Sequence, residues 1–206
     1  MRLTLYSMPS SGNSYKIRLL FALMGRDYVH VALEDDSDAL KQAHADGLLP
    51  QGKLPVLQLE DDTLLPESNA ILCYLSDGTS WMPDDKLVGA RVLAWMFFEQ
   101  NRHEPVIAVR AALRQYPNRA HLATPERMAG LLSDGHRILK ILDDHLSSRD
   151  WLVGSSPTVA DISIYAYTHT ADSRGGFDLT QFPAVIAWIA RISSLPGHIE
   201  LDDNPL

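Results

Sequence analysis

The chain has 206 residues, 46% of them hydrophobic and 21% charged, a balance that indicates a globular protein with a sizeable core. Its formal net charge of −8 at pH 7 disfavours a nucleic-acid partner and an anionic membrane surface. One cysteine, Cys73, cannot form an internal disulfide, and no signal sequence or membrane span is recognised. We therefore expect a cytoplasmic protein that binds neither nucleic acid nor membrane.

The amino-terminal segment begins with strand and helix patterns in alternation. Leu3 and Leu5 alternate with polar neighbours, which predicts a strand. A helical face follows, made by Ile17, Leu20, Phe21 and Met24. The stretch "YVHVALE" alternates again and predicts a second strand. Because a helix joins the two strands, we expect them to be parallel.

A hairpin and a further helix complete this region. The stretches "VLQLE" and "TLL" predict short antiparallel strands joined by a tight turn at "EDD". Ser68 is expected to cap the next helix, whose apolar residues are Ala70, Ile71, Tyr74 and Leu75. The predicted order over residues 1–77 is β-α-β, a polar segment, then β-β-α, which indicates an α/β domain.

The rest of the chain has the period of α-helices. Residues 78–86 are rich in turn formers and predict a linker. Residues 87–206 are then expected to form an all-α domain. Pro105 should kink or break its helix, because proline has no N–H for the helical ladder. One long helical face is made by Met128, Leu131, Leu132, Ile138, Leu139, Leu142 and Leu146.

The stretch "SSGNS", residues 10–14, leads from the first strand into the amino terminus of a helix. A thiolate at this position would be stabilised by the helix dipole and by a serine hydroxyl that donates a hydrogen bond. The structural alternative is that Ser11 or Ser14 only caps the helix.

Two further stretches fit a ligand site or an ordinary structural role. In "PESNAI", the helix start at Ser68 would attract a carboxylate and Glu67 an ammonium, which suits the zwitterionic end of an amino acid. A simple capped helix is the alternative. In "KLPVL", Pro55 belongs at the beginning of a strand. A cis bond there would turn the preceding backbone outward, whereas a trans bond would be structural.

Other patterns point to structure or to the absence of a metal. Thr158 and Asp161 have the spacing of a capping box that starts a helix. His103 and Glu104 begin like a zinc-protease helix, but Ile107 stands where the second histidine belongs. We therefore expect no metal site.

Four stretches together resemble the glutathione transferase family, and the resemblance covers nearly the whole chain. They are "SSGNSYKIRL", "GKLPVL", "LPESNAILCYL" and "SSPTVADISIYAY". The first is similar to the serine-type motif of the zeta, theta and nu classes. The stretches "VADISIYAYTHTADSRGGFDL" and "LPGHIELDD" are similar to bacterial members. The resemblance implies a thioredoxin-like α/β domain of the order β-α-β-α-β-β-α, with a helix in the polar segment, followed by an all-α helical domain.

The resemblance also implies site residues. Ser11 takes the position of the catalytic serine, with Ser10 and Asn13 as alternative donors to the sulfur of glutathione. The glutathione-binding positions are Lys53, Leu54, Pro55 as a cis-proline, Glu67 and Ser68. The electrophile site is expected between the domains, near Met8 and the helix of Glu99 and Glu104, of which one could reach a partner subunit's glutathione.

The implied activity is conjugation of glutathione, as co-substrate, to a small electrophile by a homodimer in detoxification. A maleylacetoacetate-type isomerase is an alternative. The Ser-Ser-Cys motif of those isomerases aligns here with Ser11, Gly12 and Asn13, so this chain lacks the cysteine of the motif. A disulfide-bond reductase is another alternative. A transferase-like fold that serves only as a binding or regulatory module is the non-enzyme alternative.

Overall fold

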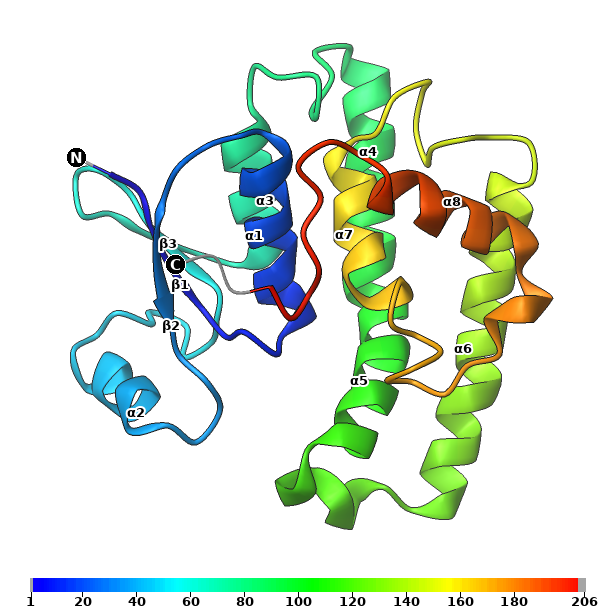
Figure 1. The fold of residues 1–206 in the computed structure, drawn as a ribbon, viewed down its shortest axis with the longest axis horizontal. Coiled ribbons are helices and arrows are strands. Elements are labelled where there is room, and N and C mark those ends of the chain that lie inside the picture. The colour runs from blue at the N-terminus through cyan, green and yellow to red at the C-terminus, as the bar shows by residue number, and fades with distance from the viewer. Residues whose placement is uncertain (1, 204–206) are drawn as a thin grey trace. The chain divides into compact units, whose positions relative to one another are not determined.

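The computed structural model describes residues 2–203, and its packing divides the chain into two compact units (Figure 1). The sheet unit consists of Met1–Thr79 with Leu195–Leu206, and the helical unit of Ser80–Ser194. The limits 1–77, 78–86 and 87–206 stay a prediction. What the packing adds is that residues 195–203 lie with the sheet unit.

The sheet unit contains a mixed sheet in the strand order β2-β1-β3-β4. β1 pairs with β2 in parallel, while β3 is antiparallel to both β1 and β4. The predicted crossover and the predicted hairpin are therefore confirmed. The strands are β1 (Thr4–Ser7), β2 (Val29–Ala32), β3 (Val56–Gln58) and β4 (Leu64–Pro66).

Helices cover both faces of this sheet because successive strand residues point to opposite sides. The helices are α1 (Gly12–Leu23), α2 (Asp38–Ala45) and α3 (Ser68–Ser76). α1 and α3 lie side by side on one face, and α2 lies apart from them (Figure 1). The core beneath α2 is formed by Leu33, Ala43, Leu49 and Val56. The predicted order β-α-β-α-β-β-α is confirmed.

The helical unit contains no strand among its described residues, which confirms the all-α expectation. None of the helices in residues 2–203 combines the length and apolar character needed to cross a membrane. The elements are α4 (Lys86–Phe98), η1 (Glu99–His103), α5 (Glu104–Gln115), η2 (Pro117–Leu122), α6 (Pro125–Leu146), α7 (Val159–Thr168), η3 (Leu179–Gln181) and α8 (Pro183–Ser193).

Near Pro105, where a kink or break is expected, the α-helical ladder changes to a π-helical one without a gap in the helix. η1 is a π-helical turn between α4 and α5, and Pro105 lies in the first turn of α5. The N–H of Glu104 donates to the carbonyl of Glu99, the i→i+5 bond of a π-helix. Proline is accepted in the first turn of a helix because its missing N–H has no partner to lose there.

The fully buried carboxylate of Asp161 anchors α7. The predicted capping box with Thr158 is confirmed, and Asp161 accepts the backbone N–H of Thr158 at 2.9 Å. It also accepts the N–H of Leu152 at 3.0 Å and the indole N–H of Trp188 at 2.9 Å. Burial raises the pKa of Asp161, and these donors oppose that shift. One side chain thus joins the start of α7 to the preceding loop and to α8.

Asp161→Ala should lower the free energy of unfolding by at least about 3 kcal/mol, because several buried donors lose their acceptor together. Denaturant unfolding followed by circular dichroism measures the change. Asp84→Ala, at an exposed position, serves as the matched control and should change it by less than about 0.5 kcal/mol. A loss below about 1 kcal/mol in Asp161→Ala would contradict the anchoring role.

Candidate functional site

The turn between β1 and α1 places Ser11 at the amino terminus of the helix. Ser11 is the N-cap residue, and its carbonyl accepts the N–H of Tyr15 at 2.9 Å. Its hydroxyl makes no capping hydrogen bond, and the first turn of α1 contains no acidic residue. The positive end of the helix dipole is therefore not offset by a side chain in that turn.

The neighbouring serine hydroxyls have other partners. Ser10 Oγ donates to Glu34 Oε1 at 2.7 Å, and its N–H donates to Glu34 Oε2 at 3.3 Å. Ser14 Oγ accepts the N–H of Met8 at 2.9 Å and so ties down the turn instead of capping the helix. Of the three serines, Ser11 has the hydroxyl best placed to donate to an incoming group.

The Leu54–Pro55 peptide bond is cis, as the resemblance implied. Pro55 is buried directly before β3, whose Val56 pairs with Tyr6 of β1. Leu54 is half-buried and Lys53 is exposed in the loop that leads to this bond. The loop therefore ends at the strand next to the one that carries the Ser11 turn.

The start of α3 differs from the expectation by one residue. Glu67, not Ser68, is the N-cap, and it adopts a φ of 73° and a ψ of 112°. A positive φ at a residue with a side chain costs of the order of 1–3 kcal/mol and is frequent at ligand sites. Glu67 is exposed, whereas Ser68 is the buried first residue of the helix.

The hydroxyl of Ser68 joins α3 to α1 instead of capping its own helix. It donates to Asn13 Oδ1 at 3.3 Å and accepts from Lys16 Nζ at 3.5 Å. Lys16 also donates to Asn69 Oδ1 at 3.5 Å. The structure thus brings together Asn13 and Ser68, which the sequence placed in separate stretches.

Lys16 is a polar residue of this region that the sequence patterns missed. It is fully buried, although lysine is almost never buried unless its ammonium has partners. Helical periodicity gives no sign of this, because the same pattern fits a lysine at the surface. The partners on α3 become visible only when the two helices are packed together.

The other expected groups have different surroundings. Glu99 is fully buried in the helical unit, where Ser163 Oγ donates to it at 3.2 Å. Glu104 is half-buried and accepts from Gln100. Burial raises the pKa of the Cys73 thiol, so this thiol stays protonated near neutral pH and is a poor nucleophile.

Comparisons with known proteins agree with the fold of a sheet domain followed by a helical domain. The family models for the glutathione S-transferase N-terminal and C-terminal domains match residues 5–79 and 125–191. A glutathione S-transferase from Xanthobacter autotrophicus Py2 is 40% identical, with 97% of this chain and 96% of that chain covered and a TM-score of 0.88. One from Pseudomonas fluorescens Pf-5 is 39% identical, with 98% and 100% covered and a TM-score of 0.91.

A more distant relative is the disulfide-bond oxidoreductase YfcG of Escherichia coli K12, which is 24% identical over 94% of this chain and 91% of that protein. From the two family models and the two bacterial structures, the chain belongs to the glutathione S-transferase family. The expected fold, a thioredoxin-like sheet domain followed by a helical domain, is confirmed.

The role that the family resemblance implies for Glu67 predicts that Glu67→Gln weakens glutathione binding about tenfold or more, because a charged partner for the γ-glutamyl ammonium would become neutral. Isothermal titration calorimetry measures the dissociation constant. Glu60→Gln, at an exposed position beside the β3–β4 turn, is the matched control and should bind like the parent protein. If Glu67→Gln also binds within twofold of the parent, Glu67 does not hold the ligand.

Proposed function

We propose that this protein is a glutathione S-transferase that joins the thiolate of glutathione to a small electrophile. The observation that carries the proposal is the Ser11 hydroxyl, which lies at the amino terminus of α1 and makes no capping bond. Glutathione serves as co-substrate, and detoxification in the cytoplasm is the role that goes with this chemistry.

Ser11 acts in this proposal as a hydrogen-bond donor to sulfur, not as a base. The thiol proton leaves to solvent, and the sulfur forms a bond to the electrophilic carbon. That carbon either releases its leaving group with the bonding pair, or its π-bond breaks and the pair moves to the conjugated acceptor, which takes a proton from solvent. Lowering a thiol pKa of about 8.5 by two requires about 2.7 kcal/mol. One hydrogen bond to a charged sulfur and the helix dipole supply energy of that order.

The rest of glutathione is assigned to the α3 end and the cis-proline loop. Glu67 and Ser68 hold the γ-glutamyl group, the Leu54 backbone before Pro55 pairs with the cysteinyl part, and Lys53 reaches the glycine carboxylate. Ser68, assigned to the γ-glutamyl group, donates a hydrogen bond to Asn13, the alternative donor to the sulfur. This contact supports the assignment of both residues to one site.

A disulfide-bond reductase is the second candidate, favoured by the likeness to the oxidoreductase YfcG. In that reaction the glutathione thiolate attacks a disulfide sulfur, a thiolate leaves and a mixed disulfide forms. A second glutathione thiolate then attacks the mixed disulfide at the sulfur of glutathione, which releases the other thiolate and gives oxidised glutathione. Product analysis by mass spectrometry separates the two activities: a thioether marks conjugation, whereas oxidised glutathione marks reduction. A binding module would retain glutathione affinity and give neither product.

Ser11→Ala should slow conjugation near neutral pH by about 10- to 150-fold, the equivalent of about 1.5–3 kcal/mol for a hydrogen bond to a charged group. The pKa of the bound thiol should rise, so the rate should be lost at neutral pH and recover as pH passes the raised pKa. Turnover of a chromogenic electrophile against pH gives both quantities.

Ser10→Ala and Asn13→Ala are the controls for this assignment. Ser10→Ala should keep the pH profile of the parent protein, because Ser10 donates to Glu34. If Ser11→Ala keeps the parent profile while Ser10→Ala or Asn13→Ala loses it, the donor lies at the other position.

The proposed enzyme is a homodimer. Apolar side chains are exposed on α4, where Leu93 is 39% and Phe97 63% exposed, one turn apart on the same face. An exposed apolar stripe on a helix suits a second copy of the chain.

Phe97→Asp should convert the dimer to a monomer at micromolar concentration, because a charge would be buried without a partner. Light scattering after gel filtration gives the mass. Leu122→Asp changes a residue that is also exposed, at 42%, and should leave the dimer intact. A monomeric parent protein would contradict the proposal.

A further inference from the structure

A single guanidinium holds the turn that precedes Ser11. Arg18 lies in the middle of α1 and is fully buried. Its Nη1 donates to Ser7 Oγ at 3.2 Å and to Met8 O at 3.4 Å, and its Nη2 donates to Pro9 O at 2.9 Å. Because the arginine donors form a rigid planar fork, these contacts orient the backbone of the turn.

The same fork also holds the carboxy-terminal segment. Nη2 of Arg18 donates to the carbonyl of Leu201 at 2.8 Å. Tyr15, on the same face of α1, donates its hydroxyl to the carbonyl of Ile199 at 2.7 Å. Both side chains are fully buried, and the guanidinium carbon lies 5.9 Å from the centre of the Tyr15 ring. Two hydrogen bonds from α1 side chains to backbone carbonyls therefore hold residues 197–203 along α1. We call these residues the tail.

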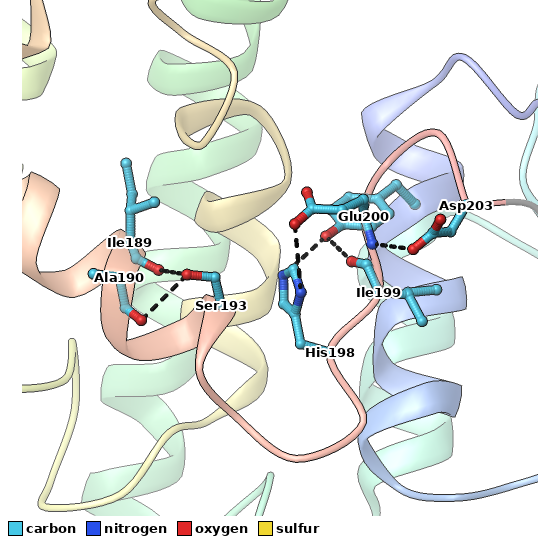
Figure 2. A network of polar contacts seen from close by, with 8 residues as sticks. Ile189, Ala190, Ser193, His198, Ile199, Glu200 and Asp203 are labelled. Atoms are coloured by element: carbon cyan, nitrogen blue, oxygen red, sulfur yellow. Dashed lines mark hydrogen bonds and ion pairs between the residues drawn. The ribbon is translucent and has the colours of Figure 1, made fainter.

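The tail packs closely against α1 at Gly197, and its later residues make polar contacts with one another. Gly197 has a φ of +85°, and a Cβ added there would lie 2.7 Å from the carbonyl oxygen of Ala22. Figure 2 shows His198 beside Glu200, with His198 Nδ1 and Glu200 Oε1 4.0 Å apart, and Glu200 N–H donating to Asp203 at 2.7 Å. The tail thus has one docked conformation that depends on a glycine.

The buried charge couples the tail to the turn. Burial lowers the pKa of Arg18, while the nearby Tyr28, Tyr15, Asp202 and Glu34 act in the opposite direction. The guanidinium stays charged near neutral pH, so its loss of hydration must be offset by the carbonyls it touches. If the tail leaves, one of these acceptors is lost and the fork is free to reorient away from the turn.

We propose that Arg18 is a positioning residue for Ser11, and that docking of the tail along α1 holds Arg18 in the orientation that places the Ser11 hydroxyl. This inference rests on the proposed role of Ser11 in thiolate formation. It adds that the tail, about 190 residues from Ser11 in sequence, governs the acidity of the bound thiol. The coupling contact is the hydrogen bond between Arg18 and Leu201, which lie 183 residues apart.

Gly197→Ala tests the inference because it undocks the tail without changing any group of the Ser11 turn. Gly154→Ala is the matched control: Gly154 also has a positive φ, of +70°, but its added Cβ would meet nothing within 4 Å. Arg18→Lys is the second variant, since it keeps a positive charge and loses the fork. The readouts are conjugation against pH, glutathione affinity by calorimetry, and hydrogen exchange of the peptide that spans the Ser11 turn.

Gly197→Ala and Arg18→Lys should raise the pKa of the bound thiol by roughly one and slow conjugation near neutral pH about 5- to 20-fold, with recovery at higher pH. Glutathione affinity should change less than about threefold, because the α3 contacts remain. Exchange in the turn should become faster. In the double variant Ser11→Ala/Gly197→Ala, the second change should add less than about twofold, because both act through one hydroxyl.

A parent pH profile in Gly197→Ala with faster exchange in the tail would overturn the inference and leave the proposed function standing. Multiplying losses in the double variant would also overturn it, since the tail would then act apart from Ser11. A parent protein that binds no glutathione and turns over no electrophile would overturn the proposed function and this inference together. If Arg18→Lys fails to fold, the Gly197→Ala results decide alone.

Discussion

The sheet unit depends on a helix that starts only a few residues after a strand. No acidic side chain in its first turn offsets the positive end of its dipole. β1 ends at Ser7 and α1 begins at Gly12, so the turn between them must satisfy its backbone groups over a very short length. Side chains of α1 itself do this: Ser14 accepts from Met8, and Arg18 donates to two carbonyls of the turn. These contacts hold the turn without the Ser11 hydroxyl, which makes no capping hydrogen bond.

This arrangement explains why α1 buries charge. A helix that packs on a sheet normally places its long charged residues in water, yet Lys16 and Arg18 are both fully buried. Each is stabilised by acceptors from elsewhere in the sheet unit, Lys16 by α3 and Arg18 by the turn and the tail. Buried cations without such acceptors would be strongly destabilising, so the acceptors and the cations must be present together.

Periodicity and local motifs were enough to predict the strands, the helices α1 and α3, the hairpin, an irregularity near Pro105 and the capping box of Asp161, while α2 came only from the family resemblance. These features depend on residues close together in sequence. The indole of Trp188 on Asp161, the link from Ser68 to Asn13 and the tail on Arg18 join distant residues, and no pattern in one sequence indicates them. The candidate site itself came from family motifs, while the separation of Ser10 from Ser11 needed the contact with Glu34.

The start of α3 shows why sequence spacing misplaces a polar site by one residue. A serine before an apolar helix is expected to be its cap, because a free hydroxyl would satisfy the first N–H groups. In the folded chain that hydroxyl is used by α1, so Glu67 becomes the cap with a strained backbone and an exposed carboxylate. The strain is tolerated because α1 and α3 are held together by the Asn13, Lys16 and Ser68 contacts. The packing of two helices, and not the local sequence, therefore sets which residue caps α3.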